Sequence, residues 1–383
     1  MKSRNISVML IAVTIFLLCS FPLVTAAQSD ADVASATVPT NIQGIRTFPV
    51  PPAGFDPRQA SDLDLARYGF PPRPDQKADP DHYAMWERVM AAAKIRWNGE
   101  LKALPGSGDF RVPGSTLSVE PAAVTAETVK KMSNVAASGV LLSNTLKKWS
   151  SKTSFSDIWT IISVPTAQIP FDSGSCFASG SADMIEVSFA GIGGYIFYSP
   201  ATGLPLFAPM LQGGVYTEID CAEGTNYYAY VGWGTYAAEF SVHPGDVFYT
   251  EVQASGPSAG SVYVEDLTTL TYNSYAVSGP TIAGNTAQWM VARPCCTNSG
   301  NLDGMYPLAN TISISFDGAT ALNGNGAQFY PGSQATSTYI LTMTDDAADQ
   351  AIELVNQGTS GFQGQHSLFF QTTGCAYTGG CTP

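Results

Sequence analysis

Basic residues are almost absent from the larger part of this 383-residue sequence. Seventeen of the 18 lysines and arginines lie at or before Lys152, and residues 153–383 keep only Arg293 beside 18 of the 31 acidic residues. That part has a net charge of −17, whereas the first 152 residues carry +4. Such an acidic surface repels nucleic acid and anionic membranes, so we expect neither as a partner. The repulsion among its carboxylates decreases as they protonate below about pH 4–5, so the composition suits an acidic medium. The alternative is that the acidic surface serves only solubility.

Familiar catalytic motifs are missing too. The sequence contains no GxSxG, no HExxH, no P-loop and no dinucleotide-binding fingerprint. Its three histidines, His82, His243 and His366, have no metal-ligand spacing, and no CxxC pair occurs. We therefore expect neither a metal nor a cofactor.

Short strand-like runs dominate the chain from about residue 148, separated by turn signals such as "HPGD" and "SGPSAG". Their number predicts an all-β sandwich or barrel. In "NTAQWMVARPCC", Ala287, Trp289 and Val291 should share one face of a strand, with Gln288, Met290 and Ala292 on the other. One late run, "DDAADQAIELVN" at 345–356, could instead be helical. The strands are predicted at 158–164, 184–192, 195–199, 214–220, 227–233, 238–242, 247–255, 261–268, 271–277, 287–293, 312–316 and 338–344.

The first 27 residues resemble a secretory signal. Lys2 and Arg4 precede an apolar run that ends in small residues near Ala26 and Ala27, so we expect a secreted protein, extracellular or periplasmic. An uncleaved anchor helix is the alternative. Once the signal is removed, no membrane contact is expected.

Residues 28–140 differ from the rest in composition. The Pro- and Arg-rich stretch 46–76 should be extended or loosely ordered, and 79–97 reads as one helix capped by Asp79 or Asp81. A basic segment ahead of an acidic domain at 141–383 suggests a propeptide that covers it electrostatically. The alternative is a permanent accessory domain.

Six cysteines remain after the signal, and an even number in an exported chain favours disulfides. Their connectivity is open, although the last two could close a short C-terminal loop. The candidates are Cys176, Cys221, Cys295, Cys296, Cys375 and Cys381.

Six short motifs follow one another along the β region: "KKWSS" (147–151), "FAGIGG" (189–194), "LQGG" (211–214), "YYAYVGW" (227–233), "NTAQWMVARP" (285–294) and "YPLANTISISF" (306–316). Their order resembles that of the eqolisins, or glutamic peptidases. The resemblance covers roughly residues 145–345. It implies a two-sheet antiparallel β-sandwich of the concanavalin or lectin type, made with a basic propeptide, and acid endopeptidase activity.

The family uses a glutamine and a glutamate to activate water and stabilise the oxyanion. The resemblance places the glutamine at Gln212 and the catalytic glutamate at Ala292, where the carboxylate is missing. Further family acids or aromatics fall on Gln288, Gly193, Phe189 and Gly232, so we expect these residues and Trp233 to line the former cleft. Tyr227, Tyr228, Tyr230 and Tyr236 could add stacking area. Glu218 is too far along its strand to replace the base, and Glu251 and Glu265 should be exposed strand residues.

Two functions remain open. The chain is either an eqolisin-family acid endopeptidase homologue with impaired catalysis, or a non-catalytic sandwich that binds peptide or polysaccharide in the former cleft. Expected partners are a polypeptide and its own propeptide, and we expect a monomer.

Overall fold

A computed structural model describes residues 36–104, 118–119, 129–134, 137–144, 146, 148–167, 184–197, 205–220, 224–233, 236–294, 306, 308–309, 311, 313–332, 337–344, 351–356 and 367–372. Residues Thr37–Pro383 form one compact unit. The predicted signal and all six candidate disulfide cysteines lie outside the described residues. No helix in the described part of the chain is long and apolar enough to span a membrane.

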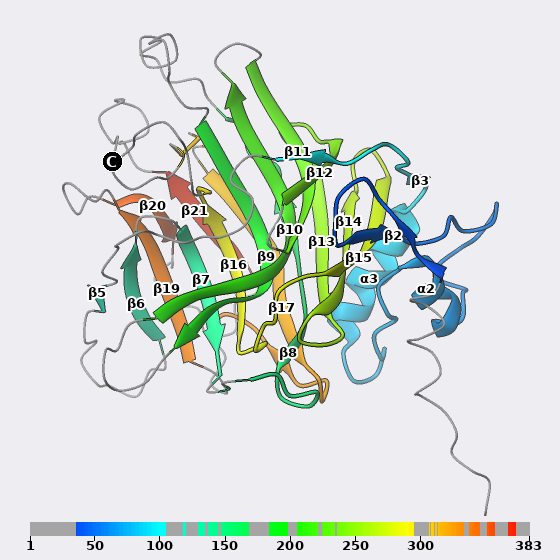
Figure 1. The fold of residues 1–383 in the computed structure, drawn as a ribbon, viewed down its shortest axis with the longest axis horizontal. Helices are drawn as coiled ribbons and strands as arrows, with labels where there is room; N and C mark the ends of the chain where they lie inside the picture. The colour runs from blue at the N-terminus through cyan, green and yellow to red at the C-terminus, as the bar shows by residue number, and fades with distance from the viewer. Residues whose placement is uncertain are drawn as a thin grey trace, which may run out of the picture. The chain divides into compact units, whose positions relative to one another are not determined.

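The first sheet is built from long, mainly antiparallel strands (Figure 1). Only the β6–β19 pair in this sheet is parallel among the described pairings. In spatial order the strands are β5 (Ser118–Val119), β6 (Val129–Asn134), β19 (Ser337–Thr344), β7 (Ala137–Ser143), β16 (Thr286–Ala292), β9 (Met184–Phe197), β10 (Pro205–Asp220), β11 (Gly224–Trp233), β12 (Tyr236–Ser241) and β4 (Lys102–Ala103).

The second sheet packs against the first, and β20 joins the two by pairing with both β19 and β21. In spatial order its strands are β21 (Leu368–Thr372), β17 (Ser313–Asn323), β8 (Phe155–Ser163), β13 (Val247–Ala254), β14 (Ala259–Asp266), β15 (Thr271–Ser278), β2 (Ile45–Thr47) and β1 (Val38–Pro39). The short β18 (Gln328–Phe329) pairs with β17, and β3 (Ile95–Arg96) pairs in parallel with β15.

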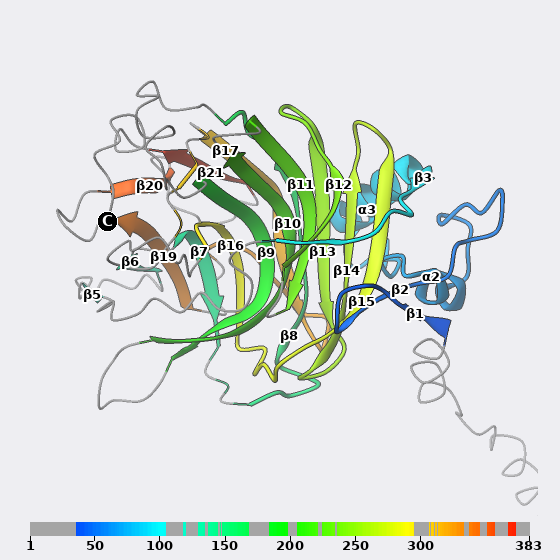
Figure 2. The same ribbon diagram turned by 45° about the horizontal axis from the view of Figure 1, so that its top comes forward.

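The main core lies between the two sheets (Figure 2). Alternation along each strand sends every second side chain into it, as Trp289 and Val291 of β16 illustrate. Leu211 and Val215 of β10 meet residues such as Val252 of β13 in this layer. The predicted two-sheet antiparallel β-sandwich is confirmed.

Each predicted strand falls on a strand of the structure, but those predicted at 184–192 and 195–199 are one continuous strand, β9, so the predicted break between them is wrong. The helical interpretation of 345–356 is wrong for its second half, because β20 (Ala351–Asn356) pairs with β21 and with the end of β19, and 345–350 lie outside the described residues. A short run such as "AIELVN" fits either a helix or a strand, and pairing with neighbouring strands decides between them.

The N-terminal segment is ordered rather than loose. Helix α2 (Asp62–Tyr68) interrupts the stretch predicted to be extended; Ser61 caps its start and Gly69, in the left-handed region, ends it. Helix α3 (Pro80–Ala92) confirms the predicted helix, with Asp79 as its cap. It ends earlier than expected because Ile95 and Arg96 join β15 as strand β3.

Candidate active site

Gln212, which the family resemblance marks as catalytic, lies on strand β10 between two glycines. It pairs with Gly232 of β11 on one side and with Gly191 of β9 on the other. Gly191 pairs in turn with Gln288 of β16. Directly paired residues point to the same side of a sheet, so the two glutamine side chains share one face. Their Cα atoms are two strand spacings, about 10 Å, apart, with only a glycine between them.

We call this surface of the first sheet the glutamine face. It is the side turned away from the second sheet, and it is largely apolar. Both glutamines are buried in it, with Gln212 2% and Gln288 1% exposed. The apolar members are Leu104, Ala137, Leu141, Ile185, Val187, Phe189, Met210, Tyr216, Tyr230, Tyr236, Ala238, Met290, Ala292 and Leu341.

A tyrosine holds the amide of Gln212. The Tyr230 hydroxyl donates a hydrogen bond to Gln212 Oε1 at 3.0 Å. Tyr230 makes edge-on ring contacts with Tyr216 and Tyr236, at centroid distances of 6.4 and 5.5 Å. Burial raises the pKa of Tyr230 well above its usual value, so the hydroxyl keeps its proton. The Gln212 amide nitrogen is thereby directed away from Tyr230.

Gln288 is held from the other side of the face. Its Nε2 donates to the carbonyl oxygen of Gly193 and lies 2.8 Å from Met210 Sδ. Thr286 Oγ1 donates to the same carbonyl at 2.7 Å. Gly193 and Gly194 both have positive φ, and a Cβ on Gly194 would lie 2.3 Å from Gln288 Nε2. The arrangement fits an amide donor at position 288, since a carboxylate there would face a carbonyl oxygen.

Ala292 lies on the glutamine face but in a different row. It pairs with Ala137 of β7 and Val187 of β9, and Val187 pairs with Tyr216 of β10. Four residues of strand, about 13 Å, separate it from Gln288. The position to which the resemblance assigns the lost glutamate is therefore farther from Gln212 than position 288 is.

Other predicted cleft residues divide between the two faces of the sheet. Phe189 packs in the glutamine face, and Gly232 lies directly beside Gln212. Trp233 instead belongs to the core between the sheets, because it follows Gly232 and must point to the opposite side. Tyr227 is in that core for the same reason, whereas Tyr228, Tyr230 and Tyr236 pack with the glutamine face.

Carboxylates on the described part of the glutamine face are remote from Gln212. Glu218 and Asp220 follow on the same side of β10, about 20 and 26 Å along the strand. Glu186 points to the other side, where it accepts hydrogen bonds from Thr311 and Ser188. Burial raises the pKa of Glu186 to about 8. None of these acids shares the row of Gln212.

A second polar cluster, missed from the sequence, lies on the outer face of the second sheet. Gln253 Nε2 donates to Glu251 Oε1 at 2.8 Å and to Asp157 Oδ2 at 3.3 Å. Tyr249 donates to Glu251 Oε2 at 2.5 Å. The prediction that Glu251 and Glu265 are exposed is wrong, since they are 1% and 0% exposed. Nothing in their own strands signals that the N-terminal helices pack on this face of the sheet.

Burial also changes how these acids titrate. The pKa of Glu251 rises to about 7 and that of Glu265 to about 8. The pKa of Asp157 rises well above its usual value because it is buried and lies near Glu251. No group of three or more histidine, cysteine, aspartate or glutamate side chains in the described ranges could hold a metal ion.

Comparison with known proteins identifies relatives. The sequence model of the peptidase A4 family matches residues 144–358. Scytalido-glutamic peptidase, solved with a peptide-based transition-state analogue, is 16% identical with a TM-score of 0.44, covering 63% of this chain and 99% of that one. SCP-B, an eqolisin solved with the tripeptide Ala-Ile-His, gives 16% identity, a TM-score of 0.43 and the same coverage. Aspergilloglutamic peptidase from Aspergillus niger is 24% identical with a TM-score of 0.37, covering 50% of this chain and 99% of that one. A search of curated proteins gave no match.

Proposed function

The chain belongs to the peptidase A4 family, and we propose that it is a secreted, catalytically impaired relative of the glutamic peptidases. One observation carries the proposal. The row that contains Gln212 has an amide, Gln288, at its nearest polar position and no carboxylate among the described residues.

Peptide hydrolysis by a glutamine–glutamate pair needs a base that takes a proton from water. The base must lie within hydrogen-bond reach of the water, or one water away from it. Gln212 can still orient a carbonyl and stabilise an oxyanion, but the amide of Gln288 cannot accept a proton at any working pH. Loss of a general base typically lowers the rate by about 10²- to 10⁴-fold.

Binding without hydrolysis is the second candidate function. Tyr230 and Tyr236 lie beside Gln212, and aromatic side chains with a few oriented polar groups are typical of ligand sites. The ligand would be a peptide or a polysaccharide. Binding that survives when hydrolysis is absent would favour this function.

A protease assay tests the primary proposal. The full-length protein, before and after acid treatment, is incubated with a denatured protein substrate between pH 2 and 5, and product peptides are quantified. We expect no cleavage above the buffer control. Cleavage by the wild type that Gln212→Ala abolishes would contradict the proposal.

Two single variants locate the missing base. If the row of Gln212 defines the site, Gln288→Glu should gain peptidase activity that increases with pH, because only the ionised fraction of the new carboxyl group can act as the base, whereas Ala292→Glu, two rows away, should gain none. The reverse result would return the base to position 292, as the family resemblance places it. Intact-mass analysis of each exported protein would also show whether residues 1–27 are removed, as expected of a cleaved secretory signal.

A further inference from the structure

We infer that residues 37–104 are a permanent layer of the folded protein and not a leader that acid releases. Apolar packing holds the layer in place, and its attachment to the sheets is stronger in acid. The inference does not depend on the glutamine face. It rests on what the segment contacts, on which charges it pairs, and on the acids that it covers.

Apolar packing is the main attachment. Helix α3 places Trp86, Val89 and Met90 against the outer face of the second sheet, and each is at most 1% exposed. Leu65 of α2 and Phe70 join the same cluster. On the sheet side the cluster contains Trp159, Ile161, Tyr249, Tyr263 and Tyr272. Removing the segment would expose this whole aromatic surface to water. Because exposing a large apolar surface is unfavourable, the segment is firmly attached.

Main-chain pairing adds a second attachment. Strand β2 pairs with β15 over Ile45–Thr47, and β3 pairs with the start of β15. Strand β4 pairs with β12 of the first sheet, and Leu104 N–H donates to the Tyr236 carbonyl at 3.0 Å. The side chain of Leu104 packs in the glutamine face. The segment therefore supplies hydrogen-bonded strands to both sheets.

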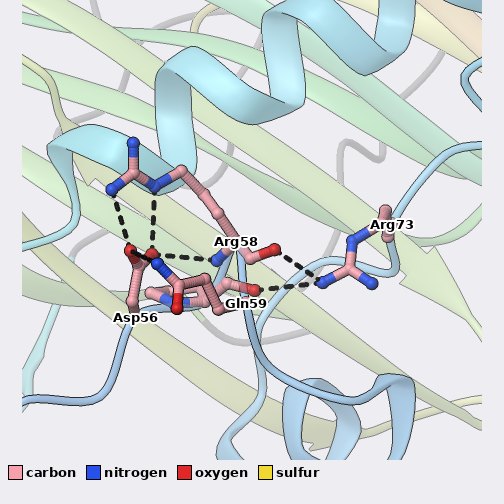
Figure 3. A network of polar contacts seen from close by, with 5 residues as sticks. Asp56, Arg58, Gln59 and Arg73 are labelled. Atoms are coloured by element: carbon pink, nitrogen blue, oxygen red, sulfur yellow. Dashed lines mark hydrogen bonds and ion pairs between the residues drawn. The ribbon is translucent and has the colours of Figure 1, made fainter.

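Three arginines of the segment make their hydrogen bonds within it, whereas Lys102 lies over the ring of Tyr228 at 5.3 Å. Figure 3 shows Arg58 bound to Asp56, at 2.8 Å, and Arg73 donating to the backbone around Arg58. Arg73 also lies 3.7 Å from Asp62 and stacks over Trp86. Arg96 donates to the carbonyls of Pro49 and Phe48.

Within the described residues, no ion pair joins residues 37–104 to the rest of the chain. The sequence suggests an electrostatic cover, but protonating the acidic domain would break no such contact. Acid therefore does not release this segment by protonating an ion-pair partner.

The acids under the layer favour attachment at low pH. Asp157, Glu251 and Glu265 lie on the covered face, and their pKa values are raised by burial, to about 7 for Glu251 and about 8 for Glu265. Each is protonated when covered, so its stabilisation is complete below the pKa of the exposed group. It is lost as the pH rises through the raised value. Each group changes the docking equilibrium by up to about tenfold per pH unit in that range.

His82 of α3 acts in the opposite direction. Its ring stacks on Trp159 at 3.6 Å, and burial lowers its pKa to about 4 despite Asp79 nearby. It therefore weakens attachment as the pH falls from about 6.5 to 4. One opposing group against three acids leaves attachment strongest near pH 4–5 and weakest at alkaline pH. The other titratable or charged groups facing this interface are Asp266, Tyr249, Tyr263 and Tyr272 on the sheet, and Lys94 and Arg96 on the layer.

Hydrogen exchange on the full-length protein tests the inference. Protection of the α3 amides, corrected for intrinsic rates, should be at least tenfold higher at pH 5 than at pH 8, and 1 M NaCl should not lower it. Intact mass after incubation at pH 3–4 should retain residues 37–104. Lower protection at pH 5 than at pH 8, release in salt, or loss of the segment in acid would each overturn the inference.

A matched pair of variants assigns the pH dependence. Glu251→Gln with Glu265→Gln should flatten the change in α3 protection between pH 5 and 8. Glu186→Gln, another buried acid with a raised pKa but lying between the sheets, should leave that change intact. An unchanged pH profile in the double variant would refute the assignment. If the double variant does not fold, each single variant should remove part of the profile.

Discussion

Residue 288 is fitted to an amide by its surroundings. The carbonyl of Gly193 accepts hydrogen bonds from both Gln288 and Thr286, and Gly194 leaves the space that the Gln288 amide occupies. A carbonyl oxygen cannot serve a carboxylate, because both groups only accept hydrogen bonds. The backbone carbonyl of Gly193 in β9 therefore favours an amide over a carboxylate at position 288.

Gln288→Glu should make stability depend on pH. Facing the Gly193 carbonyl in a buried row, the new carboxyl group should have a raised pKa and stay protonated when folded. The variant should then match the wild type below about pH 4 and lose stability as the pH rises above that value. Urea unfolding at pH 4 and pH 7 measures this, and equal losses at both would refute it.

Gly194→Ala should destabilise the protein by about 1–3 kcal/mol, because Gly194 has a φ of +94° and a Cβ would meet Gln288 Nε2 at 2.3 Å. Gly256→Ala is the matched control, since nothing lies within 4 Å of its Cβ position. Thermal unfolding of both variants should show a large loss only for the first. Similar values for both would mean that Gln288 gives way without cost.

At the scale of the element, sequence alternation predicted the strands better than it predicted their neighbours. The two faces of β16 follow directly from "AQWMVA", because every second side chain enters the core. Which row of β16 meets Gln212 could not be predicted, since register depends on pairing through β9. That register is why position 288, and not 292, lies opposite Gln212.

Helix α2 shows a local signal that composition concealed. Ser61 caps it, accepting from Asp64 N–H and donating to the Asp64 carboxylate, within a stretch that its prolines made look extended. The contact of α3 with the second sheet had no local signal, because a strand's own sequence cannot say what covers its outer face.

Trp86→Ala should cost about 3–5 kcal/mol, the usual loss for removing a large aromatic side chain from a core. Trp86 is 1% exposed and also donates to the Pro71 carbonyl at 3.1 Å. Ile95→Ala, at a position 56% exposed just beyond the same helix, should change stability by less than about 0.5 kcal/mol. Chemical denaturation compares them, and a small loss for Trp86→Ala would mean that α3 contributes little to the core.

The whole molecule combines an acidic surface with buried acids whose pKa values are raised. Burial raises the pKa values of Glu186, Glu251 and Glu265 to about 8, 7 and 8, above the usual value of 4.5. Both features favour folding in acid, because ionisation costs burial energy inside and repulsion outside.

The free energy of unfolding should therefore be highest near pH 4–5 and fall towards pH 8. Each buried glutamate contributes up to about 1.4 kcal/mol per pH unit between its unfolded and folded pKa values. Urea denaturation across this range tests the slope, and Glu186→Gln should reduce it by one group's share. Stability that rises with pH would contradict the assignment of these acids as neutral when folded.

The N-terminal segment supplies an edge strand of each sheet, β4 in the first and β1, paired through β2, in the second. Strand β4 covers β12 of the first sheet, while β2 and β3 cover β15 of the second. An uncovered edge presents unpaired N–H and C=O groups to any other extended chain, which promotes sheet-to-sheet aggregation. A protein expressed without residues 37–104 would have an unpaired strand edge in both sheets. We therefore expect the segment also to limit aggregation.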